Sequence, residues 1–351
     1  MNRILIVNLG GMGDFLLSTP ALRALRNRYP QSEIDILITT RIHKLPRSLT
    51  YIDKVFTFDM DYGGTIPFIR FYRNVKSLLT LRRKHFDIAI NMRTMVTKGS
   101  AKKMKILLDI INSGRTAGRD TDGRGYFLDV KIPETYPGTR YEMEYDIDTV
   151  KALGAEVSDR TIDFRVNKIS RQKINTILTE RGIADDVFLV GIHPGGMPSR
   201  QWPIDRFAQI IAAINKLLPC KFVITGTKKE AGIVNRLVEI TNTEIVNVAG
   251  LFDLIELGAL VERCNLFITN NTGPMHVAAI LNIPLIVIDG PTDIVRFDPR
   301  NISDNAIVLH KKVECAPCEK AECEDLQCLK AISPEEVVQA AFHFLKNKGT
   351  G

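Results

Sequence analysis

Long hydrophobic runs are missing from this sequence. No apolar stretch approaches the ~18 residues that a membrane-spanning helix needs, and no low-complexity tract is present. The N-terminus lacks the long apolar core of a signal peptide, since Arg3 leads directly into a short apolar run and a glycine-rich turn. Zinc-finger spacings and RNP signatures are absent as well. We therefore expect a globular cytoplasmic protein with no transmembrane span and no nucleic-acid partner.

The composition agrees with this expectation and adds a preference for anionic partners. The chain has 351 residues, 45% hydrophobic and 25% charged, and at ~150 residues per domain this length predicts two domains. The formal net charge is +7, and basic segments lie in the first half at 70–76, 81–85 and 98–105. Each segment alone could be the solvated face of a helix. Together they favour an anionic glycolipid, or a membrane surface rich in anionic lipid.

A strand–turn–helix pattern stands out at residues 268–279, ITNNTGPMHVAA. Apolar runs on either side predict two parallel strands joined through a helix. Asn271 and Thr272 are natural N-cap residues, and Gly273 lets the backbone come close to a ligand. The amide groups and dipole of this helix end favour an anion. Alternatively, these residues serve only the geometry of the turn.

A similar turn follows the first predicted strand, Ile4 to Val7. Its residues NLGGMGD lead into a helix with apolar residues at helical spacing. The glycines do not fit the G-x-G-x-x-G spacing of a dinucleotide-binding turn. Asp14, at the end of this turn, could simply cap the helix.

Apolar runs and amphipathic stretches alternate along the rest of the chain. This alternation favours α/β architecture with doubly wound parallel sheets over an α+β design. Further strands are predicted over 34–39, 55–58, 86–91, 163–166, 187–192, 221–225 and 245–247. Helices are predicted over 66–84, 103–111, 141–153, 170–181, 204–217, 254–264 and 333–345. The glycine- and proline-containing segment 120–141 is predicted to be a loop, and a domain boundary is expected between about 166 and 187.

Five blocks, in order along the chain, resemble glycosyltransferase family 9, the ADP-heptose:lipopolysaccharide heptosyltransferases. They are 3–24, 193–207, 268–279, 290–292 with Pro299, and 315–337. The resemblance implies a GT-B fold, in which two Rossmann-like doubly wound domains face a cleft. The acceptor domain would span 1–170 and the donor domain 183–330. A last helix at 331–348 would cross back to the first domain.

The resemblance also implies a chemistry. In an inverting transfer, one carboxylate takes the proton of the acceptor hydroxyl while the nucleotide diphosphate departs from the opposite face. Asp14 would be this general base, and Gly11 and Gly13 would leave room for the substrates. No cofactor and no catalytic metal would be required. The substrates would be an ADP-linked sugar and an anionic glycolipid or oligosaccharide at the cytoplasmic face of the inner membrane.

The donor site would lie in the second half of the chain. Arg200 takes the place of the family's usual Lys, and its planar guanidinium can hold two phosphate oxygens. Glu230 would contact the ribose hydroxyls. The family usually has Asp where this chain has Asn271, so the identity of the donor sugar stays open. The donor-binding residues are then Arg200, Glu230, Asn271, Thr272, Gly273 and His276.

Four of the six cysteines follow the spacing Cys315-x2-Cys318-x4-Cys323-x4-Cys328. In a chain without an export signal, reduced thiols are favoured over disulfides. A structural metal site of four thiolates is the alternative, although the paired C-x-x-C motifs of zinc ribbons are lacking.

Two other functions remain compatible with the sequence. A sugar-nucleotide epimerase would share the two-domain architecture, but it would convert the nucleotide sugar without an acceptor. A non-catalytic protein that binds sugar nucleotide or glycolipid would bind its ligand without turnover, and Asn271 in place of an acid keeps this interpretation open.

Overall fold

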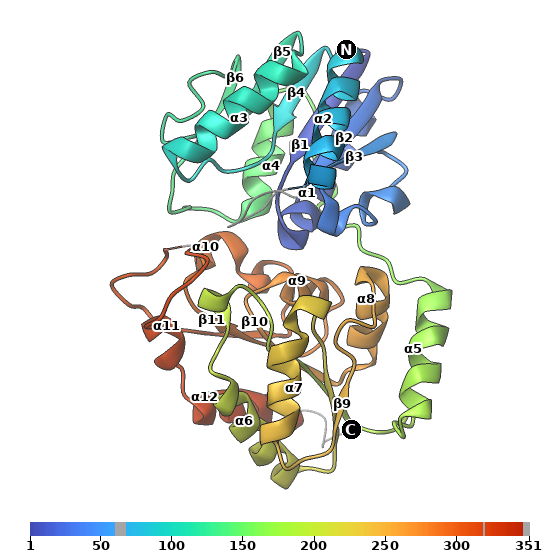
Figure 1. The fold of residues 1–351 in the computed structure, drawn as a ribbon, viewed down its shortest axis with the longest axis vertical. Helices are drawn as coiled ribbons and strands as arrows, with labels where there is room; N and C mark the ends of the chain where they lie inside the picture. Colours follow the sequence, from blue (N-terminus) through green and yellow to red (C-terminus); the bar gives the residue numbers. More distant parts are fainter. Residues whose placement is uncertain (60–67, 319, 347–351) are drawn as a thin grey trace. The chain divides into compact units, whose positions relative to one another are not determined.

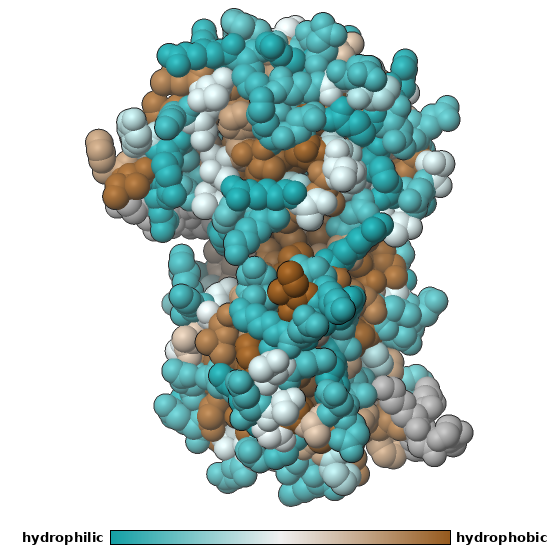
Figure 2. Space-filling view, turned by 90° about the vertical axis from the view of Figure 1, so that its right-hand side faces the viewer, coloured by the Kyte–Doolittle hydropathy of each residue, from teal (hydrophilic) through white to brown (hydrophobic). Residues whose placement is uncertain are grey.

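The computed structural model describes residues 1–59, 68–318 and 320–346. The chain divides into two units, Met1–Asp163 and Phe164–Gly351, each with its own parallel sheet and its own helices (Figure 1). Two units agree with the two Rossmann-like domains expected from the sequence, whereas the predicted domain bounds stay a prediction. No helix in the described part of the chain is both long and apolar enough to cross a bilayer. The visible surface is mainly hydrophilic with scattered hydrophobic patches (Figure 2).

The first unit is a doubly wound sheet. Its strands are β1 (Arg3–Asn8), β2 (Glu33–Thr39), β3 (Lys54–Phe58), β4 (Ile88–Asn91), β5 (Arg115–Thr121) and β6 (Val130–Glu134). Its longer helices are α1 (Met12–Arg28), α2 (Phe68–Arg83), α3 (Lys98–Ile111) and α4 (Glu142–Lys151). The strands are parallel in the order β3-β2-β1-β4-β5-β6. Helix α1 packs against α4, whereas α2 and α3 pack together over Leu5, Val7 and Ala89 of the sheet.

The second unit repeats this topology. Its strands are β7 (Leu189–His193), β8 (Lys221–Ile224), β9 (Ile245–Asn247), β10 (Leu266–Asn270), β11 (Leu285–Asp289) and β12 (Ala306–His310). Its helices include α5 (Lys168–Glu180), α6 (Ile204–Leu217), α7 (Ala231–Ile240), α8 (Leu254–Arg263), α9 (Gly273–Ile280), α10 (Ile294–Phe297), α11 (Gln327–Lys330) and α12 (Pro334–Lys346). Its strands are parallel in the order β12-β11-β10-β7-β8-β9. Counted from the other edge, this is the order of the first sheet with each strand number raised by six.

Both sheets have a topological switch point, where the chain order reverses between neighbouring strands. These points lie between β1 and β4 and between β7 and β10. Ligands of open α/β sheets bind outside the carboxyl ends of the strands at this point. The turns singled out in the sequence follow β1, β7 and β10, so the fold brings them to the switch points.

Two sequence-based predictions about local structure are wrong, and strands β5 and β12 were missed. The segment 120–141 is not a loop, because it contains the end of β5 and all of β6. Pro133 lies within β6, which is tolerated because β6 is the last strand of its sheet and need not donate to a further neighbour. Residues 163–166 form no strand. Phe164 and Val166 pack instead beside Gly258 of α8, where both are buried. Strand β12 was not predicted at all.

Capping residues indicate the helix termini better than the apolar periodicity does. Helix α3 begins five residues before its predicted start, because the side chain of Thr97 accepts a hydrogen bond from the amide of Ser100 at 3.0 Å. The predicted start of α2 at Ile66 lies outside the described residues. Helix α12 begins after the expected capping box of Ser333 and Glu336 and packs against α6 within the second unit. Its crossing to the first unit stays a prediction.

Candidate active site

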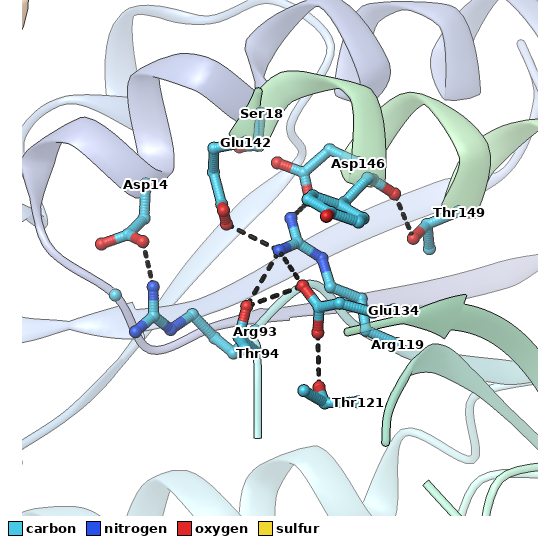
Figure 3. Close-up of polar contacts among 12 residues, drawn as sticks. Asp14, Ser18, Arg93, Thr94, Arg119, Thr121, Glu134, Glu142, Asp146 and Thr149 are labelled. Atoms are coloured by element: carbon cyan, nitrogen blue, oxygen red, sulfur yellow. Dashed lines mark hydrogen bonds and ion pairs between the residues drawn. The ribbon is translucent and has the colours of Figure 1, made fainter. Parts of the chain in front are cut away.

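Asp14 lies in the first turn of α1, at the switch point of the first sheet. One carboxylate oxygen, Oδ2, accepts a hydrogen bond from the amide of Gly11 at 2.7 Å. The other, Oδ1, forms an ion pair with Arg93, which follows β4 (Figure 3). The side chain of Asp14 is 17% exposed. A partly accessible carboxylate with a fixed orientation is therefore present where the sequence predicted a general base.

The glycines beside Asp14 differ in what they contribute. A Cβ atom on Gly10 would lie 2.6 Å from Cβ of Asp14 and 2.8 Å from Nη1 of Arg93, so a side chain there would displace the ion pair. A Cβ on Gly11 would be in ordinary contact, 3.4 Å from Asp14 Oδ2. Gly13 is buried within α1. Gly10, which the sequence did not single out as a site residue, is thus the sterically demanding position.

A buried charge cluster, which was not predicted, lies near Asp14 in the same unit. Arg119 of β5 is fully buried, and its guanidinium pairs with Glu142 at 2.6 Å and Glu134 at 3.2 Å, and also with Asp146 (Figure 3). Burial raises the pKa of Asp146 to about 7 against the opposing effect of Arg119, with Glu142 raising it further. The guanidinium of Arg119 thus pairs with three buried carboxyl groups.

In the second unit, Glu230 braces the glycine turn that follows β7. Its Oε1 accepts from the amide of Gly196 and its Oε2 from the amide of Thr227, both at 2.7 Å. A Cβ on Gly195 would lie 2.4 Å from Glu230 Oε1, so the turn must be glycine to approach this carboxylate. Burial alone would raise the pKa of Glu230, but His193 and the amide donors hold it below its ordinary value. The ribose contact predicted for Glu230 stays a prediction beside this structural role.

The turn after β10 meets the turn after β7. Asn270 donates from Nδ2 to the carbonyl oxygens of Pro194 at 2.9 Å and Gly195 at 3.0 Å. A Cβ on Gly196 would lie 2.7 Å from Cγ2 of Thr272 and 3.7 Å from Cβ of Arg200. The fold therefore brings the predicted residues Arg200, Thr272 and Glu230 together around Gly196. Asn270 was missed because its role depends on a turn 75 residues earlier in the chain.

Helix α9 begins with the features expected of an anion site. Thr272 is its N-cap residue and Gly273 its first residue, and the cap makes no side-chain hydrogen bond to the helix. The first-turn amides are thus not taken up by the capping side chain. His276 is buried and its ring meets the edge of Phe297, with 6.1 Å between centroids. Its predicted phosphate contact stays a prediction.

Asn271 does not cap the helix. It is buried, and its Nδ2 donates to Oδ1 of Asp289 at 2.6 Å, while Oδ2 of Asp289 pairs with Nδ1 of His310 at 2.7 Å. Burial raises the pKa of Asp289, against the opposing effects of His310 and Asn271, and Asp289 in turn raises the pKa of His310. Neither Asp289 nor His310 was predicted, because they end strands that come later in the chain.

The segment 315–328 holds four of the six cysteines, those for which a structural metal site was the alternative. All six are free thiols, and among the described residues no three potential ligands are grouped so that they could hold a metal ion. Cys315 is exposed, Cys318 and Cys323 are half-buried, and Cys328 is buried. Burial raises the pKa of the Cys328 thiol, and the structural metal site stays an untested alternative.

We expect Asn271→Asp to destabilise the second unit by about 1–3 kcal/mol, because the variant replaces the donor to Asp289 with a second buried carboxyl group. One of the two groups must then hold a proton in the folded state that the unfolded state releases. The loss should therefore grow as the pH rises, which thermal unfolding at about pH 6 and about pH 8 measures. Asn235→Asp, on the exposed face of α7, is the control. An equal loss at both pH values would contradict the prediction.

Two Rossmann-like units of identical strand order, with an oriented carboxylate at one switch point and paired glycine turns at the other, have the architecture of the GT-B fold. Residues 75–329 match the model of glycosyltransferase family 9 (heptosyltransferase). The chain belongs to this family, and the resemblance seen in the sequence is confirmed.

Individual proteins agree with the family assignment. A lipooligosaccharide heptosyltransferase 2 of Campylobacter jejuni is 25% identical over 350 residues, covering 96% of each chain. A family 9 glycosyltransferase structure from Veillonella parvula has a TM-score of 0.76 at 25% identity, and the match covers 99% of this chain and 97% of that one. The structure of ADP-heptose lps heptosyltransferase II from Escherichia coli has a TM-score of 0.72 at 20% identity, with 99% of each chain covered. At 20% identity, the similarity to the Escherichia coli structure shows only that the two chains share a fold.

Proposed function

We propose that this glycosyltransferase moves a heptose or a related sugar from an ADP-linked donor to a lipopolysaccharide core or other glycolipid acceptor, with inversion at the anomeric carbon. The first unit takes the acceptor and the second unit the donor. Two of the relatives named above support the proposal: one is a lipooligosaccharide heptosyltransferase 2 and the other is ADP-heptose lps heptosyltransferase II. The observation that carries the proposal is the geometry of Asp14, which the Gly11 amide and Arg93 hold in one orientation.

In the proposed step, the carboxylate of Asp14 takes the proton of the acceptor hydroxyl. The acceptor oxygen forms a bond to the anomeric carbon as the bond from that carbon to the diphosphate oxygen breaks, and ADP leaves with the electron pair. The departing negative charge needs stabilisation, which the cation of Arg200 and the amides at the start of α9 would supply. One displacement inverts the configuration, so no second carboxylate acts as nucleophile.

Asn271 in place of Asp does not leave its surroundings without a carboxyl group. Asn271 donates directly to the buried carboxyl group of Asp289. A carboxyl group is therefore present one hydrogen bond away from the position where the family resemblance leads one to expect Asp. This arrangement makes the donor sugar the property to be measured.

The test is ADP release from the purified protein with ADP-heptose, with and without a deacylated lipopolysaccharide acceptor. Acceptor-dependent release supports the proposal. Conversion of the nucleotide sugar without acceptor would identify an epimerase instead. Binding without release on every acceptor would identify a binding protein. If ADP-heptose neither binds nor reacts, a panel of other nucleotide sugars shows whether the arrangement at Asn271 selects another donor, and failure of the whole panel would overturn the proposal.

A further inference from the structure

Helix α2 carries a stripe of exposed apolar side chains. Phe68, Tyr72, Val75 and Leu79 recur at i, i+4, i+7 and i+11, which is the spacing of one helix face. Phe68 is 81% exposed and Tyr72 62% exposed, and Phe71 next to them is 56% exposed. Single exposed apolar residues are normal on a protein surface, but a contiguous aromatic patch marks an interaction site.

This stripe is not a misplaced core face, because the opposite side of α2 already packs on the sheet. Leu81 is fully buried and belongs to the core under α2 and α3. Asn74 is buried too, and its side chain accepts from the amide of Asp59 at 2.8 Å and donates to its carbonyl oxygen at 2.9 Å. These contacts fix the rotation of α2 about its axis and leave the apolar stripe on the outside.

The same surface is strongly basic. Helix α2 has five cationic residues and no acidic residue: Arg70, Arg73, Lys76, Arg82 and Arg83. Its neighbour α3 has four lysines against one aspartate and exposes Ile106 and Ile110. Arg82 donates to the carbonyl oxygen of Ile110 at 3.0 Å, so the two helices form one continuous face (Figure 1). We call the exposed residues of α2 and α3 the α2–α3 surface.

Exposed aromatic residues interleaved with cations are typical of a helix that lies in the interface of an anionic bilayer. Aromatic rings favour the headgroup level, and each Lys or Arg near an anionic surface adds attraction. A second copy of the chain would instead bring two strongly cationic surfaces together. We propose that the α2–α3 surface docks the enzyme on anionic phospholipid, with Phe68, Phe71 and Tyr72 entering the headgroup region. This inference rests on the proposed function, since it places the enzyme where a glycolipid acceptor is embedded.

The test is cosedimentation of the full chain with vesicles of phosphatidylcholine alone and of phosphatidylcholine with phosphatidylglycerol. We expect binding to the anionic vesicles only, weakened by salt. Arg70→Gln, Lys76→Gln and Arg83→Gln combined should reduce this binding about 100-fold, since each basic residue contributes about fivefold near an anionic surface. The combination Phe68→Ser, Phe71→Ser and Tyr72→Ser should reduce it at least about tenfold. The matched control, which changes the exposed Ile169 and Leu251 of the second unit to Ser, should bind as the wild type does.

Enzyme assays separate this inference from the proposed function. With a deacylated acceptor in solution, the docking variants should release ADP at the wild-type rate, whereas with an acylated acceptor in anionic vesicles their rate should fall. Wild-type transfer without any vesicle binding would overturn the docking surface and leave the proposed function standing. Vesicle binding without transfer would overturn the proposed function and leave the docking surface standing. The inference would also be overturned if the wild type does not bind lipid but forms dimers at high concentration or binds RNA. If the triple variants abolish that dimerisation or RNA binding, the α2–α3 surface serves another partner.

Discussion

Replacing Asp14 by Asn should lower the rate of acceptor-dependent ADP release at least about 100-fold, the usual size of the loss when a general base is removed. The amide keeps the shape of the side chain and can still accept from Gly11, but it cannot take a proton from the acceptor hydroxyl. Because the donor is proposed to bind in the second unit, the dissociation constant for the ADP-sugar should not change. The measurement combines initial rates at saturating substrate with donor binding by calorimetry.

The Asp14 variant needs controls for the ion pair that it breaks. Arg93→Gln removes the partner of Asp14 but keeps the carboxylate, so it should cost less activity than Asp14→Asn. Asp109→Asn, which breaks an exposed ion pair with Lys105 on α3, should leave the rate unchanged. If Asp14→Asn keeps more than about a tenth of the activity, or loses it only through weaker donor binding, Asp14 is not the base.

Local patterns in the sequence were sufficient to predict the strands and turns at the switch points. Helix α6 has its predicted bounds, 204–217, because Pro203 marks its start and apolar residues recur at helical spacing to its end. The turns at Gly10 to Asp14, at Gly195 and Gly196, and at Asn271 to Gly273 were also visible, since each lies within a few residues of its strand. Topology then brings such turns together without further information.

Features that depend on partners distant in the chain were not predictable in this way. Strand β5 carries Arg119 at a buried position. A charged residue does not indicate a buried strand unless its partners are known. Those partners, Glu142 and Asp146, come from α4, more than 20 residues later. Asp289 and His310 were missed for the same reason. The exposure of the apolar residues on α2 could not be predicted either, because periodicity shows that a face is apolar without showing what covers it.

The second large effect should come from Arg119→Met, which removes a fully buried cation that pairs with three buried carboxyl groups. Breaking a buried ion pair by removing one partner costs about 3–5 kcal/mol, because the remaining charges stay buried without compensation. For a unit of this size, that loss lowers the melting temperature by about 10 °C. Calorimetry and urea unfolding measure it. Arg160→Met, which breaks an exposed pair with Glu144 on the same helix α4, should change stability by less than about 1 kcal/mol.

The pH dependence distinguishes an electrostatic loss from a simple packing defect. In the wild type, Arg119 opposes the rise that burial causes in the pKa of Asp146, so without Arg119 this group retains its proton to higher pH in the folded state. The deficit of Arg119→Met should therefore shrink as the pH falls from about 8 to about 5. A packing defect would cost the same at both values. A constant deficit would show that the guanidinium acts through its volume and not its charge.

Asp146 provides the complementary measurement in the same cluster. Burial raises its folded-state pKa from an ordinary value of 3.8 to about 7, so between these two values the folded state holds a proton that the unfolded state has released. The stability that this group contributes is therefore complete below the lower pKa and declines as the pH rises towards 7. Asp146→Asn keeps a neutral side chain at every pH, so its stability curve should be flatter than that of the wild type across this window. If the two curves run parallel, Asp146 is ionised throughout, and Arg119 pairs with a full carboxylate at neutral pH.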